Sequence, residues 1–381
     1  MNKNICLVHG AMSGNGGGER VVISLAQALS KLDCKVTVIV LDEQKINLPF
    51  DDSNFKIWYI KKPKQSGNLL KFTHTARQSK LLRQKIIETG VSFDLFISHS
   101  VYDATICKRL KLPNVYYAIH GAIGIQHSLN TGFAKFKQQA EYSPASILKF
   151  IIRIFFYKWF VVNLYSNESL IVDSHGIKQD LLKFGIQPKS IQTIYNPFDF
   201  NNIRQQSVEY SVSESDYIIH VGRFDAIKRH DILIKAYKQS GIKQKLLLLG
   251  DDSGPIGQNL HKLVLDLGLE NGVIFKGFTS NPFPYIKNAQ ALILSSDSEG
   301  FGLVLGEALV LNTPVVSTDC VSGPSEILTD ELKPFLSPVG DIEALAKNIK
   351  KMINNQVEIT DKYIDRFSAE KIAKQYLSLC D

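Results

Sequence analysis

Short apolar runs recur along the chain and alternate with longer stretches in which apolar residues return every three or four positions. The short runs predict buried β-strands, and the longer periodic stretches predict helices that pack against them. Strands are predicted at residues 5–9, 36–41, 94–98, 114–119, 170–174, 217–221, 245–249, 273–275, 291–294 and 314–318. Regular alternation of strand and helix indicates an α/β fold with parallel sheets.

The periodic stretches place helices between most of these strands. The turn after residue 294 contains Ser298, a residue type suited to cap the helix that we expect to continue to residue 311. The other predicted helices are residues 19–32, 69–89, 231–239, 260–267, 285–288, 341–354 and 368–379.

A domain boundary is predicted close to Pro197. Proline stiffens the backbone and biases the residue before it away from helix, and the polar composition of residues 201–216 is typical of a linker. The length of 381 residues is enough for two cores. We therefore expect one domain at residues 1–198 and a second at residues 199–360, with a ligand cleft between them.

The turn that follows residue 294 carries the densest candidate chemistry. Gly300 and Gly302 allow the backbone to approach a ligand closely, and the amides at the start of the next helix favour an anion such as a diphosphate. Glu299 and Glu307 can face one crevice, where carboxylates accept hydrogen bonds from sugar hydroxyls. The alternative is an ordinary helix N-terminus with a solvated Glu307.

The glycine-dense residues 10–18 form a second phosphate-friendly turn, between the first strand and the first helix. A dinucleotide fingerprint that starts at Gly14 and Gly16 needs glycine or alanine at position 19, where Glu19 stands. The sequence therefore disfavours a nicotinamide or flavin site. A phosphate-binding turn and a merely flexible loop stay open as alternatives.

Two further candidates stand at strand ends. Arg223 and Lys228 flank the loop after strand 217–221, and two cations at the carboxyl end of a strand suit a diphosphate. A solvated basic turn is the alternative. His120 follows strand 114–119, at the edge where α/β sheets bind ligands, although an isolated histidine is more often structural. His99 and His127 are weaker candidates.

These motifs together resemble a known family. Glu299 and Glu307, with seven residues between them that include Gly-Phe-Gly-Leu, resemble the signature of retaining GT-B glycosyltransferases of the glycosyltransferase family 4 type. Residues 318–327, the Gly-Gly-Gly-Glu-Arg string at 16–20 and the Gly-Arg…Lys loop at 222–228 resemble other motifs of that family.

The chain departs from the family pattern at two places. Phe224 replaces the usual leucine, and Arg229 replaces the usual glycine and can alter the backbone of its loop. Residues 50–110 and 125–165 match the family least.

The resemblance implies the GT-B fold, in which two Rossmann-like domains face each other across a cleft. It also implies that residues 361–381 form a C-terminal helix that crosses back to the first domain. Glu299 is then expected to contact the hydroxyls of the donor sugar, and Glu307 the ribose of the nucleotide.

The resemblance also assigns roles to the other candidates. Gly17 approaches the donor phosphate, Arg223 and Lys228 bind the diphosphate, and His120 reaches the sugar near its anomeric carbon. The predicted catalytic residues are therefore Glu299, His120, Lys228 and Arg223. The predicted donor-binding residues are Gly17, Arg223, Lys228, Phe278, Glu299, Phe301, Gly302, Leu303, Val304 and Glu307, with Phe278 beside the nucleotide base.

Composition narrows the partners. The formal net charge of +7 is a mild excess that suits an anionic membrane face or a diphosphate-bearing substrate, without the long basic runs of a nucleic-acid binder. The five cysteines are scattered without metal-ligand spacing, which favours a reducing compartment, and no Asp-x-Asp triplet occurs. We therefore predict no metal and no resident cofactor.

Two segments are candidates for membrane contact. Residues 56–85 are rich in lysine and arginine, which indicates either a solvated face or a patch for anionic phospholipid. Residues 145–166 are strongly apolar but interrupted by Lys149, Arg153 and Lys158. A helix packed against the sheet is the favoured interpretation, and a helix that dips its aromatic side chains into the bilayer interface is the rival.

The sequence thus predicts a retaining glycosyltransferase that uses a nucleotide diphosphate sugar as donor. We expect UDP-hexose or UDP-N-acetylhexosamine, with GDP-mannose as the alternative. The expected acceptor is a lipid-linked or lipopolysaccharide-type glycan, at the inner face of the cytoplasmic membrane, in cell-surface polysaccharide biosynthesis. A sugar-nucleotide epimerase of the same fold and a non-catalytic glycan-binding module are the alternative functions.

Overall fold

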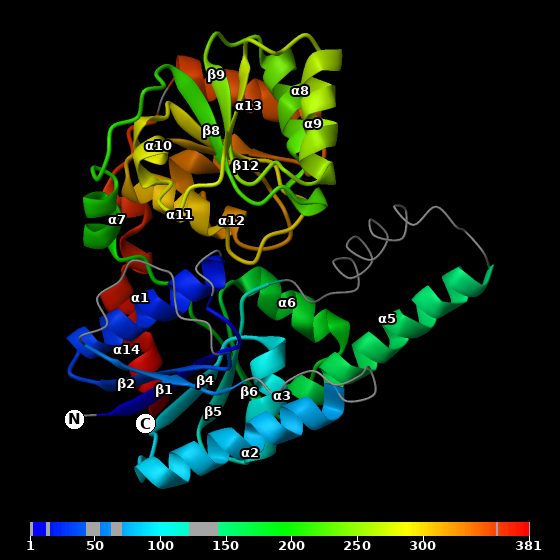
Figure 1. Ribbon diagram of the computed structural model, residues 1–381. Coiled ribbons are helices and arrows are strands. Elements are labelled where there is room, and N and C mark those ends of the chain that lie inside the picture. The colour runs from blue at the N-terminus through cyan, green and yellow to red at the C-terminus, as the bar shows by residue number, and fades with distance from the viewer. Residues whose placement is uncertain are drawn as a thin grey trace.

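Each half of the chain folds around its own parallel β-sheet, as the alternation of strand and helix predicts (Figure 1). The computed structural model describes residues 3–12, 16–42, 54–61, 71–121, 144–355 and 357–380. The two domains lie one above the other in Figure 1, with the N-terminal domain below and the C-terminal domain above. The predicted fold, two Rossmann-like α/β domains, is confirmed.

The N-terminal sheet has the strand order β3-β2-β1-β4-β5-β6-β7, and all its neighbouring strands are parallel. Hydrophobic cores form on both of its faces, because its strands bury successive side chains on opposite sides. The strands are β1 (Asn4–His9), β2 (Lys35–Val40), β3 (Lys56–Tyr59), β4 (Leu95–Ser98), β5 (Val115–Ile119), β6 (Ser169–Val172) and β7 (Ser190–Thr193). The helices are α1 (Gly17–Lys31), α2 (Lys71–Thr89), α3 (Val101–Leu110), α5 (Pro144–Tyr165) and α6 (His175–Phe184).

The C-terminal sheet repeats this plan in the order β10-β9-β8-β11-β12-β13. Its strands are β8 (Tyr217–Val221), β9 (Lys245–Leu249), β10 (Val273–Gly277), β11 (Ala291–Leu294), β12 (Val315–Thr318) and β13 (Leu336–Ser337). Its α-helices are α7 (Phe200–Gln206), α8 (His230–Ser240), α9 (Pro255–Asp266), α10 (Phe283–Asn288), α11 (Leu303–Val310), α12 (Pro324–Ile327) and α13 (Ile342–Asn354). Short 3-10 turns are η2 (Ala226–Lys228), η3 (Asp330–Phe335), η4 (Asp361–Tyr363) and η5 (Asp365–Phe367).

Both sheets reverse their strand order at one point, between β1 and β4 and between β8 and β11. Ligands of such sheets bind outside the carboxyl ends of the strands at this reversal. Residues that follow the carboxyl ends of strands in the two sheets meet between the domains. The backbone of Gly300, after β11, lies against the carbonyl of His120, after β5. The fold therefore directs both ligand-binding edges into one interdomain space.

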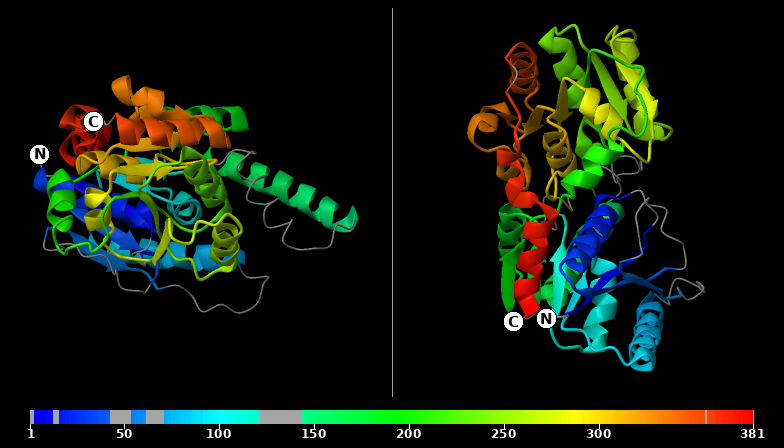
Figure 2. Two further views of the ribbon diagram at one scale, coloured as in Figure 1. Left: turned by 90° about the horizontal axis from the view of Figure 1, so that it is seen from above. Right: turned by 90° about the vertical axis from the view of Figure 1, so that its left-hand side faces the viewer.

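The chain crosses between the domains twice, at adjacent positions. Phe198 N donates to the carbonyl of Phe367 (3.0 Å), and Ala369 N donates to the carbonyl of Phe198 (2.9 Å). After the second crossing, α14 (Ala369–Leu377) and η6 (Ser378–Cys380) lie beside α1, as Figures 1 and 2 show, and α14 packs into the N-terminal core. The two chain segments that these hydrogen bonds join, at Phe198 and at Phe367–Ala369, together form the hinge.

The hinge corrects the predicted C-terminal segment. Tyr363, Ile364 and Phe367 still pack in the C-terminal core, so the crossing helix begins at Ala369 and not at residue 361. The residues expected to form a linker, 201–216, also begin within α7, which the Asp199 side chain caps by accepting from Asn202 N (3.1 Å). The exact residues at which the two domains and the returning segment begin and end stay a prediction.

Helix α5 does not follow the favoured interpretation of a packed helix. Among its described side chains, 149–165, the buried ones are Val161, Leu164 and Tyr165 at the C-terminal end, and the helix projects away from the body of the molecule (Figures 1 and 2). Its exposed large apolar side chains are Ile151, Ile152, Phe155, Phe156 and Trp159. Within the described residues, no helix combines the length and apolarity required to traverse a bilayer.

A carboxylate from the C-terminal domain binds the start of a helix in the N-terminal domain. Glu326, on α12, accepts hydrogen bonds from the backbone amides of His175 (2.9 Å) and Gly176 (3.0 Å) in the first turn of α6. Its Oε2 also accepts from the hydroxyl of Tyr195 (3.1 Å). An anion at a helix N-terminus interacts favourably with the helix dipole, so Glu326 stabilises the contact between the domains.

We expect Glu326→Gln to destabilise the protein by about 1–2 kcal/mol, because the amide provides one acceptor oxygen, without charge, for two backbone amides. Urea unfolding followed by fluorescence measures this change. Glu370→Gln is the matched control, since Glu370 pairs with Lys374 on the exposed side of α14 (2.6 Å) and such pairs contribute little. Equal unfolding free energies for the two variants would contradict the prediction.

Candidate active site

The turn between β11 and α11 is anchored by Phe301. This side chain is buried and packs in the hinge, with ring-centroid distances of 5.5 Å to Tyr195, 6.2 Å to Phe198 and 5.3 Å to Phe367. The ring of Phe301 is therefore not available to a donor, and the predicted donor contact of this residue stays a prediction. Its ring holds the turn in place, and only its backbone can face a ligand.

The two positions that flank Phe301 require glycine for different structural reasons. A Cβ on Gly300 would lie 2.2 Å from the carbonyl oxygen of His120, so the domains could not approach this closely with any other residue. Gly302 adopts the left-handed region (φ 87°) and precedes α11. The helix thus begins at Leu303, and the prediction that Ser298 caps it is wrong.

Glu299 is held by a cation from the neighbouring loop. Its Oε1 accepts from Lys228 Nζ (2.6 Å) and from the hydroxyl of Ser296 (2.5 Å), and both charged side chains are largely buried. Its carbonyl oxygen accepts from the hydroxyl of Ser322 (2.6 Å). The structure therefore brings together the two residues that the sequence placed on sugar and diphosphate.

The loop after β8 leaves the other predicted cation, Arg223, exposed to solvent. The Arg223 side chain is 83% exposed, and its nearest ionic partner is Asp225 (3.3 Å). Arg229 adopts a left-handed conformation (φ 48°) that favours glycine, the usual residue of the family at this position. Ion pairs with Asp231 (3.0 Å) and Asp297 (3.0 Å) hold it there, so the loop tolerates the replacement.

The N-termini of helices α1 and α11 lie close together. A Cβ on Gly17, the first residue of α1, would lie 2.7 Å from Cδ1 of Leu303, the first residue of α11. Neither helix has a side-chain cap hydrogen bond. Backbone amides and two helix dipoles therefore point toward the same space, an arrangement that favours an anionic ligand.

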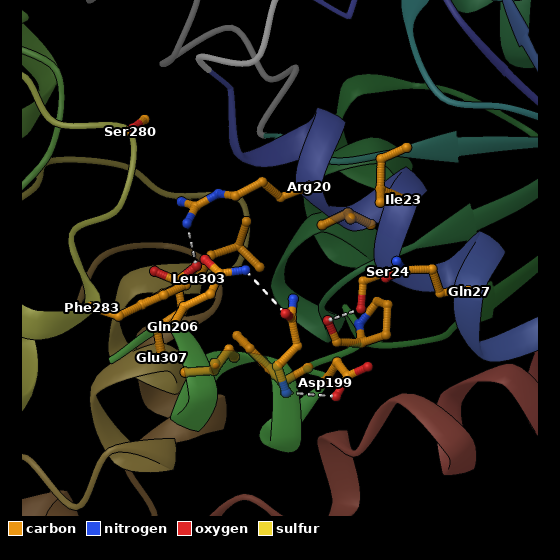
Figure 3. Close-up of a pocket in the computed structure, with 15 residues that line it drawn as sticks. Arg20, Ile23, Ser24, Gln27, Asp199, Gln206, Ser280, Phe283, Leu303 and Glu307 are labelled. Atoms are coloured by element: carbon orange, nitrogen blue, oxygen red, sulfur yellow. Dashed lines mark hydrogen bonds and ion pairs between the residues drawn. The ribbon is translucent and has the colours of Figure 1, made fainter. Parts of the chain in front are cut away.

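Glu307 lies on α11, about one helical turn after Leu303. It lines a pocket that is open to solvent and has about 750 Å³ of free space. Figure 3 shows Arg20 of α1 pointing toward Glu307 across the interface of the two domains. Arg20 Nη1 is 2.8 Å from Glu307 Oε1. Burial raises the pKa of Glu307, and the charge of Arg20 acts in the opposite direction.

The His120 ring points into the N-terminal domain. Its Nε2 is 2.9 Å from Nδ1 of His99, whose ring is nearly coplanar with it (7° between the ring planes), and its Nδ1 is 3.5 Å from a carboxylate oxygen of Asp173. The Nδ1 distance is too long for a good hydrogen bond. The part of His120 nearest the Glu299 turn is thus its carbonyl group, and the predicted sugar contact of His120 stays a prediction.

The remaining predicted donor residues, Leu303, Val304 and Phe278, differ in exposure. Leu303 and Val304 are half-buried at the start of α11, and Phe278, after β10, is largely exposed. His127 lies outside the described residues. Among the described residues, no group of three His, Cys, Asp or Glu side chains is arranged to hold a metal ion. Sequence reasoning missed Arg20, although it stands in the quoted Gly-Gly-Gly-Glu-Arg string.

The fold and this site define a GT-B glycosyltransferase, and comparison with known proteins agrees. Residues 200–371 match the glycosyl transferases group 1 model, and residues 15–202 match the Glycosyltransferase Family 4 model. The two matches together extend over nearly the whole chain. The protein therefore belongs to the GT-B glycosyltransferases of the family 4 type.

Individual relatives extend this assignment. The chain is 28% identical to the N-acetylgalactosamine-N,N'-diacetylbacillosaminyl-diphospho-undecaprenol 4-alpha-N-acetylgalactosaminyltransferase of Campylobacter jejuni, over 96% of each chain. It is 30% identical to the lipopolysaccharide 1,6-galactosyltransferase of Escherichia coli over 50% of this chain and 54% of that protein. The structure of Anabaena HepE in complex with UDP-glucose aligns over 98% of each chain, with a TM-score of 0.75 and 20% identity.

Two buried histidines lie beneath the Lys228 loop. His230 stacks on Phe224 (4.3 Å between centroids) and contacts His220 edge-on (4.5 Å). Neither ring nitrogen of His230 has a hydrogen-bond partner among the described residues. Burial, followed by the charges of His220 and Lys228, lowers the pKa of His230 to about 2, so this ring is neutral in the folded protein.

We expect His230→Phe to reduce the acid sensitivity of the fold. Below pH 6.5 the unfolded chain binds a proton at His230 that the folded protein excludes, so the free energy of unfolding falls by up to about 1.4 kcal/mol per pH unit. Phenylalanine removes this loss and keeps the stacking on Phe224. Urea unfolding at about pH 7.5 and about pH 5.5 measures it. An identical pH dependence in both proteins would refute the assignment.

Proposed function

We propose that the protein is a retaining glycosyltransferase that moves a hexose or N-acetylhexosamine from a nucleotide diphosphate sugar, with UDP as the nucleotide, to a lipid-linked glycan. The observation that carries the proposal is the Glu299–Lys228 pair beside two uncapped helix N-termini. A carboxylate for sugar hydroxyls and a concentration of positive potential for a diphosphate are thus adjacent.

Each part of this arrangement has a role in the proposed transfer. Glu299 accepts hydrogen bonds from donor sugar hydroxyls while Lys228 fixes its orientation. Lys228 has further N–H groups for the diphosphate, and the exposed Arg223 can swing onto it. Both cations offset the negative charge that develops on the departing nucleotide, and such electrostatic stabilisation is commonly the largest catalytic contribution.

The interdomain position of the site supports transfer to a glycan over transfer to water. The Glu299 turn contacts the N-terminal domain through the hydroxyl of Ser174, which donates to the carbonyl of Gly300 (3.2 Å), and through the His120 carbonyl. A donor bound here is covered by both domains, which limits its hydrolysis. Retention of configuration requires the acceptor to attack on the face that the nucleotide leaves.

Relatives support the choice of donor and acceptor. The Campylobacter protein is an N-acetylgalactosaminyltransferase whose name includes a diphospho-undecaprenol acceptor, and HepE binds UDP-glucose. We infer the same classes for this chain, a UDP-sugar donor and a glycan on a lipid diphosphate, in the assembly of cell-surface polysaccharide. No metal or resident cofactor has a role in the proposed transfer.

A donor panel tests the function. UDP- and GDP-linked hexoses and N-acetylhexosamines are incubated with acceptor mixtures, products are identified by mass, and nuclear magnetic resonance gives the anomeric configuration. A glycoside with the donor's configuration is the expected product. Donor conversion without an acceptor would favour an epimerase, and binding without turnover would favour a glycan-binding module.

We expect Lys228→Met and Glu299→Gln each to lower kcat by roughly 10²–10³-fold, because each removes a charge that faces the reacting groups. Initial rates at saturating donor and acceptor measure the change. Lys262→Met is the matched control, since it breaks a lysine–carboxylate pair on the exposed surface of α9 (2.7 Å) and leaves turnover unaltered. Wild-type kcat in the Lys228 and Glu299 variants would overturn the assignment.

Helix α5 supports a second part of the proposal, contact with an anionic membrane. At 100° per residue, the exposed apolar side chains occupy one arc, with Lys149 and Arg153 on one flank and Lys158 on the other. Phe155 and Trp159 are 70% and 66% exposed. An apolar stripe with aromatic residues and flanking cations is typical of helices that lie in the bilayer interface.

We expect a Phe155→Ser, Trp159→Ser double variant to bind anionic vesicles at least about tenfold more weakly, because it removes two aromatic side chains from the interfacial stripe. Sedimentation with phosphatidylglycerol vesicles measures binding, and phosphatidylcholine vesicles test the contribution of charge. Leu265→Ser controls for the loss of an apolar group that is 60% exposed on α9. Equal vesicle affinity of the double variant and the wild type would exclude α5 as the membrane contact.

A further inference from the structure

The carboxylate of Glu307 has an unusual environment for a group expected to bind a ligand. Its side chain is 6% exposed, and its Oε1 is 2.8 Å from Nη1 of Arg20. Its other oxygen, Oε2, is buried and has no hydrogen-bond partner among the described residues. One oxygen is thus occupied by protein, and the second is an unused acceptor.

This environment makes the carboxylate dependent on Arg20. Burial disfavours the ionised form of an acid, and the charge of Arg20 opposes that effect at Glu307. The ion pair with Arg20 also restricts the Glu307 carboxylate to one orientation, since the planar guanidinium of arginine donates along fixed directions. Without Arg20, the side chain would lose both its counter-charge and its fixed geometry.

The partners come from different domains. Arg20 is in the first turns of α1, and Glu307 is in α11, where the close contact of Gly17 and Leu303 holds the two helices together. Figure 3 shows both side chains at the wall of the pocket that reaches from α1 to Ser280 and Phe283 near α10. The Glu307 carboxylate therefore has its counter-charge only when the two domains are together.

We propose that Arg20 is a positioning residue, which orients the Glu307 carboxylate at the wall of the pocket so that it accepts hydrogen bonds from the ribose hydroxyls of the donor nucleotide. The inference rests on the proposed function, in which Glu307 meets the ribose. It adds that recognition of the ribose requires a residue of the opposite domain. A purely structural ion pair would instead hold the domains together without affecting how the ribose is read.

Binding of UDP and of 2′,3′-dideoxy-UDP, measured by calorimetry, separates these roles. The wild-type protein is expected to bind UDP about tenfold more tightly than the dideoxy form. Arg20→Gln should weaken UDP binding about tenfold and reduce the preference for ribose to less than about twofold, with kcat at saturating donor changed much less than KM. Arg20→Lys should restore part of the preference, because it returns the positive charge.

Lys31→Gln is the matched control, because it removes another ion pair of α1, with Asp199 (3.1 Å), and should keep the wild-type preference for ribose. Circular dichroism checks that every variant is folded. A full preference for ribose in Arg20→Gln overturns the positioning role alone and leaves the proposed function intact. A wild-type protein that binds neither UDP nor GDP overturns the proposed function, and the role of Arg20 with it.

Discussion

The packing of Phe301 in the hinge is the constraint on which the site depends. The ring is inserted between Tyr195, Phe198 and Phe367, which belong to the two places where the chain crosses between domains. Because Phe301 is fixed, the residues on either side of it are fixed as well. Glu299 is directed toward Lys228, and the left-handed Gly302 starts α11 in the direction that brings Glu307 to Arg20.

Helix N-termini then decide how the interdomain space is charged. Helices α1, α6 and α11 are among those that begin there. Helix α6 is capped by Ser174 and bound by the carboxylate of Glu326, so its dipole is compensated within the protein. Helices α1 and α11 begin without a side-chain cap, and their first residues are in contact. Glu19 stands in the first turn of α1, whereas α11 has no acidic residue in its first turn, so the start of α11 retains its positive potential where we propose that the diphosphate binds.

The regular part of this structure could be predicted from the sequence because it depends on local patterns. Buried strands such as β8, β9 and β11 have the predicted bounds, since a continuous apolar run between polar turns has few other solutions. The short strands β3 and β7 were missed, because edge strands of about four residues with mixed polarity carry little signal. The resemblance correctly placed Glu299 and Lys228 together, although they are far apart along the chain.

What could not be predicted depends on contacts between domains. Nothing local distinguishes Phe301, which packs in the hinge, from an aromatic residue that faces a ligand. The same holds for Arg20, whose partner is on the other domain. The position of helix α5 was predicted wrongly for a related reason, because an apolar sequence with a few cations is compatible with a buried helix and with a helix on a lipid surface. The exposure of Phe155 and Trp159 in the structure distinguishes these two interpretations.

The two acids of the motif consequently differ in how they are controlled. Glu299 takes its cation from the same domain, through a loop held to β11 by the hydroxyl of Ser295, which donates to the carbonyl of Lys228 (2.7 Å). That half of the site persists if the domains separate. Glu307 takes its cation from the opposite domain, so its half is complete only in the closed arrangement.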